Sequence, residues 1–418
     1  MIKAIKGTRD ILPPESSLWG WVESTAREIL ELYGFAEIRT PIFERTELFA
    51  RSVGEDTDIV SKEMYTFQDR DDTSLTLRPE GTAPVVRAYL EHHLYQDSQI
   101  LKLYYAGPMF RRERPQKGRY RQFHQIGAEV LGSQNPAIEA EVIEMLQLFL
   151  ERVGIKGSSL LVNSIGCSDC RPAFLAELKK ALASKRSLLC EDCQRRSETN
   201  PLRVLDCKVE SCQPIIDALP SISDFLDQAC RSHFDKFLQY LRDREISFRI
   251  VPRLVRGLDY YTRTTFEITS DALGAQNTLV GGGRYDGLSE ILEGPPTQGF
   301  GFALGLERLV LILQASGSSH YSRPLQVFLV PLGEEAFGKA ALLARNLRRQ
   351  GVACLYDFES RSLKSALRLA NKLQAQYALI VGEKELQSGR YPLKRMSDGV
   401  QTDLSLDEIS KTILATTR

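Results

Sequence analysis

The densest run of chemically capable side chains lies between Arg111 and Arg121, where six basic residues accompany the single acid Glu113. Pro115 and Gly118 interrupt regular structure inside this run, and apolar and polar residues alternate on both sides of it. The pattern predicts a β-hairpin with a basic loop at its tip. Guanidinium groups bind phosphate oxygens bidentately, so we expect a bound phosphorylated ligand rather than a merely solvated tip.

The second flank of this hairpin adds polar groups to one strand face. Gln125 and Glu129 fall on the same face as Phe123 and Gly127, and the intervening residues face the other way. Polar side chains on a strand face, and not only at a loop tip, favour a binding site over a solvated surface.

A second segment, residues 299–308, combines glycine with arginine. Phe300, Phe302 and Leu304 occupy one face of the expected strand, and the opposite face is almost bare backbone, formed by Gly299, Gly301, Ala303 and Gly305. Such a face lets a flat ligand approach the main chain, although close packing against a helix would also explain it. Arg308 follows in the first turn of a helix, where its charge opposes the helix dipole, and this conflict suggests contact with a phosphate or a base.

Two more segments place charged side chains beside glycine. Arg256 precedes a strand together with Tyr260 and Tyr261, and a nearby strand ends in the glycines 281–283. Glu80 stands where a strand at 74–78 should meet a helix at 83–93, with Thr82 as the expected N-cap. This carboxylate could hold the ammonium group of a ligand.

Six of the eight cysteines lie between positions 167 and 212. Two C-x2-C pairs separated by 19 residues have the spacing of a structural zinc site, with the candidate ligands Cys167, Cys170, Cys190 and Cys193. Cys207 and Cys212 exceed what one zinc ion needs, so the membership of the site stays open. The alternative is a set of small buried thiols in a helical segment. A redox C-x2-C is disfavoured because no thioredoxin-like strand precedes either pair.

Hydrophobic periodicity predicts the elements that must position these groups. Before position 164 we expect, in order, a helix at 16–33, the strand at 74–78, the helix at 83–93, the hairpin at 101–131 and a helix at 136–152. Residues 164–246 change character and read as a helical insertion between two halves of one sheet, with helices at 171–184, 213–219 and 223–241. Strand patterns return at 248–252, 262–269 and 276–282, and residues 299–316 run from a strand into a helix.

A polar stretch at 314–324 is the expected linker to a separate α/β module. In that module we expect strands at 326–332, 352–356 and 377–381, alternating with helices at 335–350 and 361–374. The predicted domains are 1–163, 164–246, 247–323 and 324–418.

Composition limits the class of protein. The chain has 418 residues, of which 43% are hydrophobic and 26% charged, and its net charge is zero. Zero net charge excludes a uniformly basic nucleic-acid coat. Residues 325–418 nevertheless hold 14 basic and 10 acidic residues, so this module could meet a polyanion. No apolar run reaches the ~18 residues of a membrane helix and no secretory signal is visible, so we expect a cytoplasmic protein without a membrane partner.

These segments together resemble the histidyl-tRNA synthetase family of class II aminoacyl-tRNA synthetases. Residues 6–13 resemble the family's opening, and residues 16–44, 103–132 and 299–313 resemble class motifs 1, 2 and 3. Residues 256–261 and 282–287 resemble the two histidine-specific signatures. The resemblance implies an α+β catalytic domain with an antiparallel sheet flanked by helices, the helical insertion, and a C-terminal α/β domain that binds the anticodon.

The resemblance also implies residue roles. ATP would be bound by Arg111, Arg308, Gly301 and Gly305, and Arg111 and Arg256 would be catalytic. Histidine would be bound by Glu80, Thr82, Gln125, Glu129, Tyr260 and Tyr261. Arg114 and Gln116 would contact the acceptor end of the tRNA.

The implied reaction joins L-histidine to its tRNA through a histidyl-adenylate, with ATP and Mg²⁺, in a homodimer formed through residues 16–44. The resemblance does not extend to zinc in the insertion. The alternative function is a non-catalytic regulatory paralogue that senses histidine. Such paralogues generally lack the C-terminal module and lose the arginines, whereas here residues 325–418 and Arg111, Arg256 and Arg308 are all present.

Overall fold

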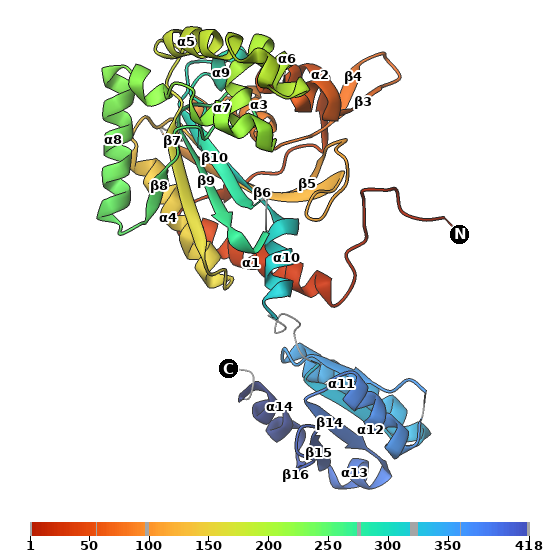
Figure 1. Cartoon of the computed structure of the whole chain (residues 1–418). Helices are drawn as coiled ribbons and strands as arrows, with labels where there is room; N and C mark the ends of the chain where they lie inside the picture. The colour runs from red at the N-terminus through yellow and green to blue at the C-terminus, as the bar shows by residue number, and fades with distance from the viewer. Residues whose placement is uncertain are drawn as a thin grey trace. The chain divides into compact units, whose positions relative to one another are not determined.

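The computed structural model describes residues 2–55, 57–96, 100–273, 277–317, 325–359 and 361–415. The chain divides into two compact units, residues 1–321 and 322–418, which are described separately here (Figure 1). Of the expected linker at 314–324, residues 318–324 lie outside the described residues. In the described part of the chain, no helix is both long and apolar enough to span a bilayer.

An eight-stranded sheet forms the centre of the first unit (Figure 1). Its strands, from edge to edge, are β1 (Ala36–Glu37), β5 (Leu101–Phe110), β6 (Gln122–Leu131), β11 (Gly299–Gly305), β10 (Thr278–Arg284), β9 (Thr262–Ser270), β7 (Ser158–Ser164) and β8 (Phe248–Ile250). Only the outermost pairs, β1 with β5 and β7 with β8, are parallel. The antiparallel sheet and the hairpin at 101–131 are therefore confirmed.

Four helices cover one face of this sheet and bury the main hydrophobic core. They are α1 (Glu15–Leu32), α4 (Ala137–Arg152), α8 (Gln228–Asp243) and α10 (Leu306–Ala315). Alternate strand residues, including Ile126, Phe300 and Phe302, enter this core. Period-2 alternation then turns Gln125 and the glycine positions of β11 toward the opposite face, as the sequence predicted.

Smaller elements border the opposite face. The three-stranded sheet has the order β2 (Phe43–Arg45), β4 (Ser74–Leu77), β3 (Tyr65–Gln68). Around it lie the helices α2 (Thr46–Val53), α3 (Thr82–Glu91) and α9 (Leu288–Ile291), and a π-helical turn at Ile59–Glu63. π-turns recur at functional sites, and in this one only Met64 separates the turn from β3.

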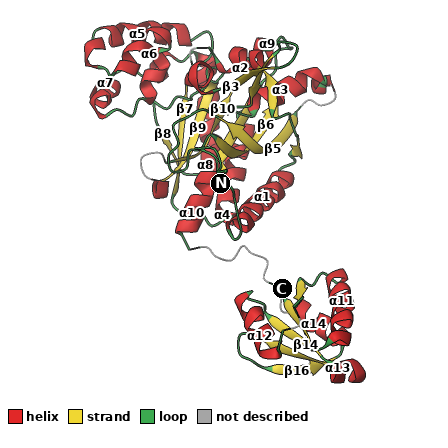
Figure 2. Cartoon of the chain, turned by 90° about the vertical axis from the view of Figure 1, so that its right-hand side faces the viewer, coloured by secondary structure: helices red, strands yellow, loops and turns green. Residues whose placement is uncertain are grey.

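The insertion contributes α5 (Arg171–Ala183), α6 (Glu191–Thr199) and α7 (Gln213–Asp217), which Figures 1 and 2 show gathered together beyond one end of the sheet. The helices expected at 171–184 and 213–219 are confirmed, but α6 was not predicted. The helix expected at 223–241 begins only at Gln228, because the Asp227 carboxylate caps it by accepting the Cys230 N–H at 2.6 Å.

The second unit is an α/β domain. Its sheet has the order β13 (Cys354–Tyr356), β12 (Val327–Pro331), β14 (Tyr377–Val381), β15 (Tyr391–Arg395), β16 (Gln401–Leu404), and its helices are α11 (Glu334–Arg349), α12 (Leu363–Lys372), α13 (Glu383–Ser388) and α14 (Leu406–Ala415). The alternation expected up to residue 381 is confirmed. The antiparallel strands β15 and β16 were not predicted.

Candidate active site

A cavity of about 690 Å³ opens on the face of the eight-stranded sheet opposite the four helices. Strands β6, β11, β10 and β9 form its floor, with Gln125, Ala303, Gly305, Gly281 and Glu267 among the lining residues. The volume is within the range of pockets that hold nucleotides and other small ligands. Residues far apart in the sequence thus converge on one site.

The N-terminus of α3 supplies one wall of the cavity. The Glu80 carboxylate accepts the backbone N–H groups of Thr82 at 2.7 Å and Ala83 at 2.9 Å, and thereby caps the helix. The expected N-cap role of Thr82 is wrong, because Gly81 holds that position and the Thr82 hydroxyl donates to Glu129 at 2.7 Å. Burial raises the pKa of Glu80 in spite of these bonds, so a cationic ligand group would favour its ionised form.

Glu129 lies beneath the cavity and is fully buried. Its carboxylate accepts the hydroxyls of Thr82 and Tyr285, the latter at 2.6 Å, and burial raises its pKa to about 8. A Cβ at Gly301 would lie 1.8 Å from this carboxylate. Gly301 therefore does not line the cavity, whereas Gly305 does. The expected place of Gly301 on an open glycine face is wrong, because the absence of a side chain at Gly301 makes room for Glu129.

Three further side chains expected to bind histidine converge on the same end of the cavity. Tyr260 and Tyr261 line it and are buried, and the Tyr260 hydroxyl lies 3.4 Å from the Glu80 carboxylate. Gln125 also lines it, and its buried Oε1 has no hydrogen-bond partner among the described residues. An amide oxygen left unpaired in this way suits a ligand that brings an N–H donor.

Arg111 and Arg308 line the cavity from two elements. The Arg111 Nε donates to the Pro79 carbonyl at 2.9 Å, and its guanidinium lies 5.4 Å from the centre of the Phe123 ring. Arg308, in the first turn of α10, donates to the Thr278 carbonyl at 2.6 Å. Burial lowers the pKa of Arg308, and the nearby charges of Arg119 and Arg111 lower it further, so this end of the cavity is suited to an anion.

Arg256 projects over β10 and pairs with Glu267 on β9. Burial is the largest single influence and opposes its charge, but Glu267, Tyr261, Asp206 and Tyr260 together outweigh burial and raise the pKa of Arg256 above its usual range. A Cβ at Gly281 would lie only 2.1 Å from its guanidinium, so this glycine is required by the close approach. The Arg256 Nε is buried and has no hydrogen-bond partner among the described residues.

Arg114 and Gln116 do not belong to the cavity. Both are exposed on the loop that joins β5 to β6, and neither is a lining residue. The loop turns back at a bridge between Gln116 and Arg119, and Gly118 packs close to Arg308. The exposed side chains are therefore free to meet a large partner at the mouth of the site.

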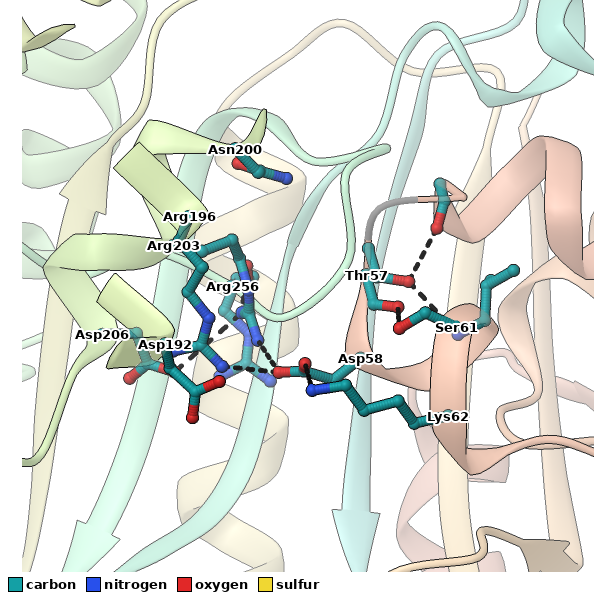
Figure 3. Close-up of polar contacts among 12 residues, drawn as sticks. Thr57, Asp58, Ser61, Lys62, Asp192, Arg196, Asn200, Arg203, Asp206 and Arg256 are labelled. Atoms are coloured by element: carbon teal, nitrogen blue, oxygen red, sulfur yellow. Dashed lines mark hydrogen bonds and ion pairs between the residues drawn. The ribbon is translucent and has the colours of Figure 1, made fainter. Parts of the chain in front are cut away.

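An ionic network beside Arg256 had no signal in the sequence (Figure 3). Asp58 lies 2.6 Å from Arg196, 3.9 Å from Arg203 and 3.4 Å from Lys62, and it joins the insertion to the π-helical turn. Burial opposes its charge, but Arg196 and Lys62 outweigh burial and hold the pKa of the carboxyl below its usual range. Arg203 also donates to the Arg256 carbonyl at 3.2 Å, so the network reaches the cavity wall.

The cysteines do not form the single site that their spacing suggested. Cys190 and Cys193 cluster with Cys207 and Cys212, whereas Cys167 and Cys170 cluster with Asp227 and Cys230. The two C-x2-C pairs thus belong to different groups, because β7 ends just before the first pair, whereas the second pair lies at the N-cap and in the first turn of α6.

Comparisons with sequence models and with individual relatives all point to the same family. The sequence model described as histidyl-tRNA synthetase matches residues 7–309, and the one described as anticodon binding domain matches residues 326–416. The histidine–tRNA ligase of Solibacter usitatus is 56% identical over 411 residues, covering 98% of both chains. That of Syntrophotalea carbinolica is 51% identical, covering 100% of this chain and 99% of the relative.

The fold has a similar solved relative. The crystal structure of the apo histidyl-tRNA synthetase of S. aureus is 39% identical in sequence and superimposes with a TM-score of 0.83, covering 99% of this chain and all of that one.

Proposed function

The chain belongs to the histidyl-tRNA synthetase family, and from the side chains of its cavity we propose how it carries out the reaction of that family. The protein is a histidine–tRNA ligase, which uses ATP, L-histidine and the histidine tRNA. One observation carries the proposal for the site: a buried amide oxygen on Gln125 and a buried N–H on Arg256 are both unpaired among the described residues. The two groups match an ammonium donor and a phosphate acceptor.

We assign histidine to the end of the cavity at α3. The carboxylate of Glu80 and the amide oxygen of Gln125 accept the α-ammonium of histidine, with Thr82 beside them. Glu129, Tyr260 and Tyr261 recognise the imidazole, which needs both a donor and an acceptor to be distinguished from its isosteres. Burial raises the pKa of Tyr261 to about 12, so its hydroxyl keeps its proton and can donate.

ATP occupies the arginine end. Arg111 and Arg308 hold the phosphates, and the adenine lies over the open backbone at Gly305, where no atom stands within 4 Å of an added Cβ. Mg²⁺ neutralises phosphate charge when bound; Glu113 and Glu267 are carboxylates that line the same cavity. Gly301 supports this surface from below by accommodating Glu129.

The first chemical step is in-line attack of the histidine carboxylate on the α-phosphorus, which yields histidyl-adenylate and pyrophosphate. Negative charge builds on the phosphoryl oxygens, and Arg256 and Arg111 stabilise it. A preorganised donor of this kind contributes roughly 10²–10³-fold in rate. The terminal ribose hydroxyl of the tRNA then loses its proton and attacks the acyl carbon, which breaks the bond from that carbon to the phosphate oxygen and releases AMP, so no side-chain nucleophile is required.

The tRNA meets two parts of the chain. Arg114 and Gln116 contact the acceptor end from the exposed loop, where a basic group and an amide suit phosphate and base edges. The unit at residues 322–418, which matches the anticodon-binding family, binds the anticodon with its excess of basic residues.

Several further features belong to the same proposal. The chain acts as a homodimer through residues 16–44, supported by the exposed apolar side chains of Ile42 and Phe43. Its location is the cytoplasm, where tRNA is charged. Its domains are 1–163, 164–246, 247–323 and 324–418.

The test is ATP–pyrophosphate exchange with each of the twenty amino acids, without tRNA. Exchange with histidine alone is the expected result. Histidine binding without any exchange would instead identify the non-catalytic regulatory paralogue, which the three arginines of the cavity disfavour.

A further inference from the structure

The insertion holds two groups of metal-ligating side chains that the reaction does not use. The four-thiol group consists of Cys190, Cys193, Cys207 and Cys212, and the three-thiol group consists of Cys167, Cys170, Cys230 and the carboxylate of Asp227. Within each group the ligand atoms all lie within 4.8 Å of one another, and most of the thiols are buried. Each group therefore offers four convergent ligands.

The spacing of the sulfur atoms matches one small tetrahedral ion. Zn–S bonds of about 2.3 Å meeting at the tetrahedral angle place neighbouring sulfurs about 3.8 Å apart. The sulfurs of Cys167 and Cys170 are 3.7 Å apart, those of Cys170 and Cys230 3.9 Å, and those of Cys190 and Cys207 3.8 Å. A disulfide would bring two sulfurs to about 2.05 Å, and an iron–sulfur cluster would hold them farther apart around its larger core.

The backbone around both groups is suited to a negatively charged metal–thiolate centre. Cys170, Cys190 and Asp227 occupy the N-cap positions of α5, α6 and α8, where the positive ends of the helix dipoles lie. Neither cysteine makes a side-chain capping bond, so the thiols do not serve as ordinary caps. Backbone N–H groups point at sulfur instead, from Cys167 to Cys170 at 3.1 Å and from Cys190 to Cys212 at 3.2 Å.

Asp227 can serve two purposes at once. Its Oδ1 caps α8, and its Oδ2 lies 3.1 Å from the sulfur of Cys167. The adjoining Gly166 has φ of +66°, and a Cβ there would lie 2.6 Å from the sulfur of Cys170. The capping bond thus orients the Asp227 carboxylate as the fourth ligand, and Gly166 leaves room for the sulfur of Cys170.

We propose that each group binds one zinc ion, and that the two zinc sites hold the segment 253–263 from opposite ends. This inference goes beyond the proposed function and rests on it only in that this segment carries Arg256 and Tyr261. The three-thiol site secures one end, because the Gly166 carbonyl accepts the backbone N–H of Arg263 at 2.8 Å. Arg171, the first residue of α5, donates to the Tyr261 carbonyl at 2.8 Å.

The four-thiol site secures the other end. Gln213 donates to the Cys207 carbonyl at 2.7 Å and accepts from Arg253 at 3.2 Å. Arg203, on the short helical turn that ends just before Cys207, donates to the Arg256 carbonyl, and Figure 3 shows it beside Arg256 and Asp58. The two zinc ions would therefore hold the segment that carries Arg256 and Tyr261 in position, and they would take no part in the chemistry.

The first test is the metal content of the full-length protein, purified without chelators and measured by inductively coupled plasma mass spectrometry. The wild type should hold two zinc ions per chain, and Cys190→Ser and Cys167→Ser one each. Cys354→Ser, a buried thiol of the second unit outside both groups, is the matched control and should keep two. Fewer than two ions in the wild type, iron instead of zinc, or loss of both ions from one variant would overturn the assignment.

A second measurement keeps the proposal testable if a variant fails to fold. Cobalt exchanged into the wild-type protein should show the absorption bands of tetrahedral thiolate coordination, and their absence would overturn both sites. Hydrogen exchange followed by mass spectrometry then tests positioning. Amides of 253–263 should exchange at least about tenfold faster in Cys167→Ser, and those of 377–381 should not change. Unchanged exchange of 253–263 would refute the positioning role, whereas failed pyrophosphate exchange in a two-zinc protein would refute only the proposed function.

Discussion

Gly281→Ala should disable histidine activation by displacing Arg256 while leaving the fold intact. The added methyl group would lie 2.1 Å from the guanidinium of Arg256, whereas ordinary contact begins at about 3.4 Å. The guanidinium must therefore shift by at least about 1.3 Å. Because this group is the far end of a flexible side chain, the shift costs little stability but breaks its alignment with Glu267.

The expected loss is large for one methyl group. A misplacement of about 1 Å in a positioned catalytic group typically costs about 10²-fold in rate, and loss of one charge-stabilising donor costs 10²–10³-fold. We therefore expect the rate of histidine-dependent ATP–pyrophosphate exchange to fall by two to three orders of magnitude. Gly338→Ala, at a position of α11 with open space around it, is the matched control and should leave exchange unchanged.

A double-mutant cycle separates displacement of Arg256 from direct obstruction of ATP by the methyl group. If Gly281→Ala acts through Arg256, it should add little to Arg256→Ala, which by itself should lower exchange to a similar extent. Full additivity of the two losses would show that the methyl group obstructs the ligand. Normal exchange by a folded Gly281→Ala protein would refute the geometry assigned to Arg256.

The remaining predictions concern three other parts of the chain. The pKa of Glu129 rises from 4.5 to about 8 on folding, so its contribution to stability is intact below pH 4.5 and lost as the pH rises through 8. Between pH 5 and 9, the free energy of unfolding measured by thermal melts should fall more for the wild type than for Glu129→Gln, by a difference of at most about 5 kcal/mol. Parallel pH profiles of the two proteins would contradict this. Asp58→Asn should destabilise the first unit by about 1–3 kcal/mol, because Arg196 and Arg203 lose their carboxylate, and should raise the KM for histidine; an unchanged melting curve would contradict it. Deletion of 325–418 should spare pyrophosphate exchange but impair tRNA charging, and normal charging would exclude an anticodon role.

Local patterns predicted most of the fold. Alternation in 122–131 and 299–305 correctly assigned the faces of β6 and β11, because the side-chain period of a strand is set by its backbone alone. Periodicity failed where elements are short and polar. Helix α6 has a short polar sequence, and β15 and β16 are strands of five and four residues with few buried side chains, although each pairs with its neighbour in the sequence.

The candidate site was predicted by residue type more reliably than by contact. Gln125, Arg111, Arg256 and Arg308 all line one cavity, as the motifs suggested. Asp58 was missed because an isolated aspartate carries no pattern, and its arginine partners Arg196 and Arg203 lie more than 130 residues away.

The sequence by itself determined which groups could do chemistry, since side-chain type and local spacing are properties of the chain. It specified the arginines, the glycine face and the cysteine pairs, together with the strands and helices that carry them. Only the tertiary structure decided which of these groups meet. It placed Gly301 against Glu129, divided the cysteines between two groups, and set Arg256 over Gly281. The physical reason is that contacts between distant segments depend on how strands pair and helices pack, and spacing along the chain does not encode those distances.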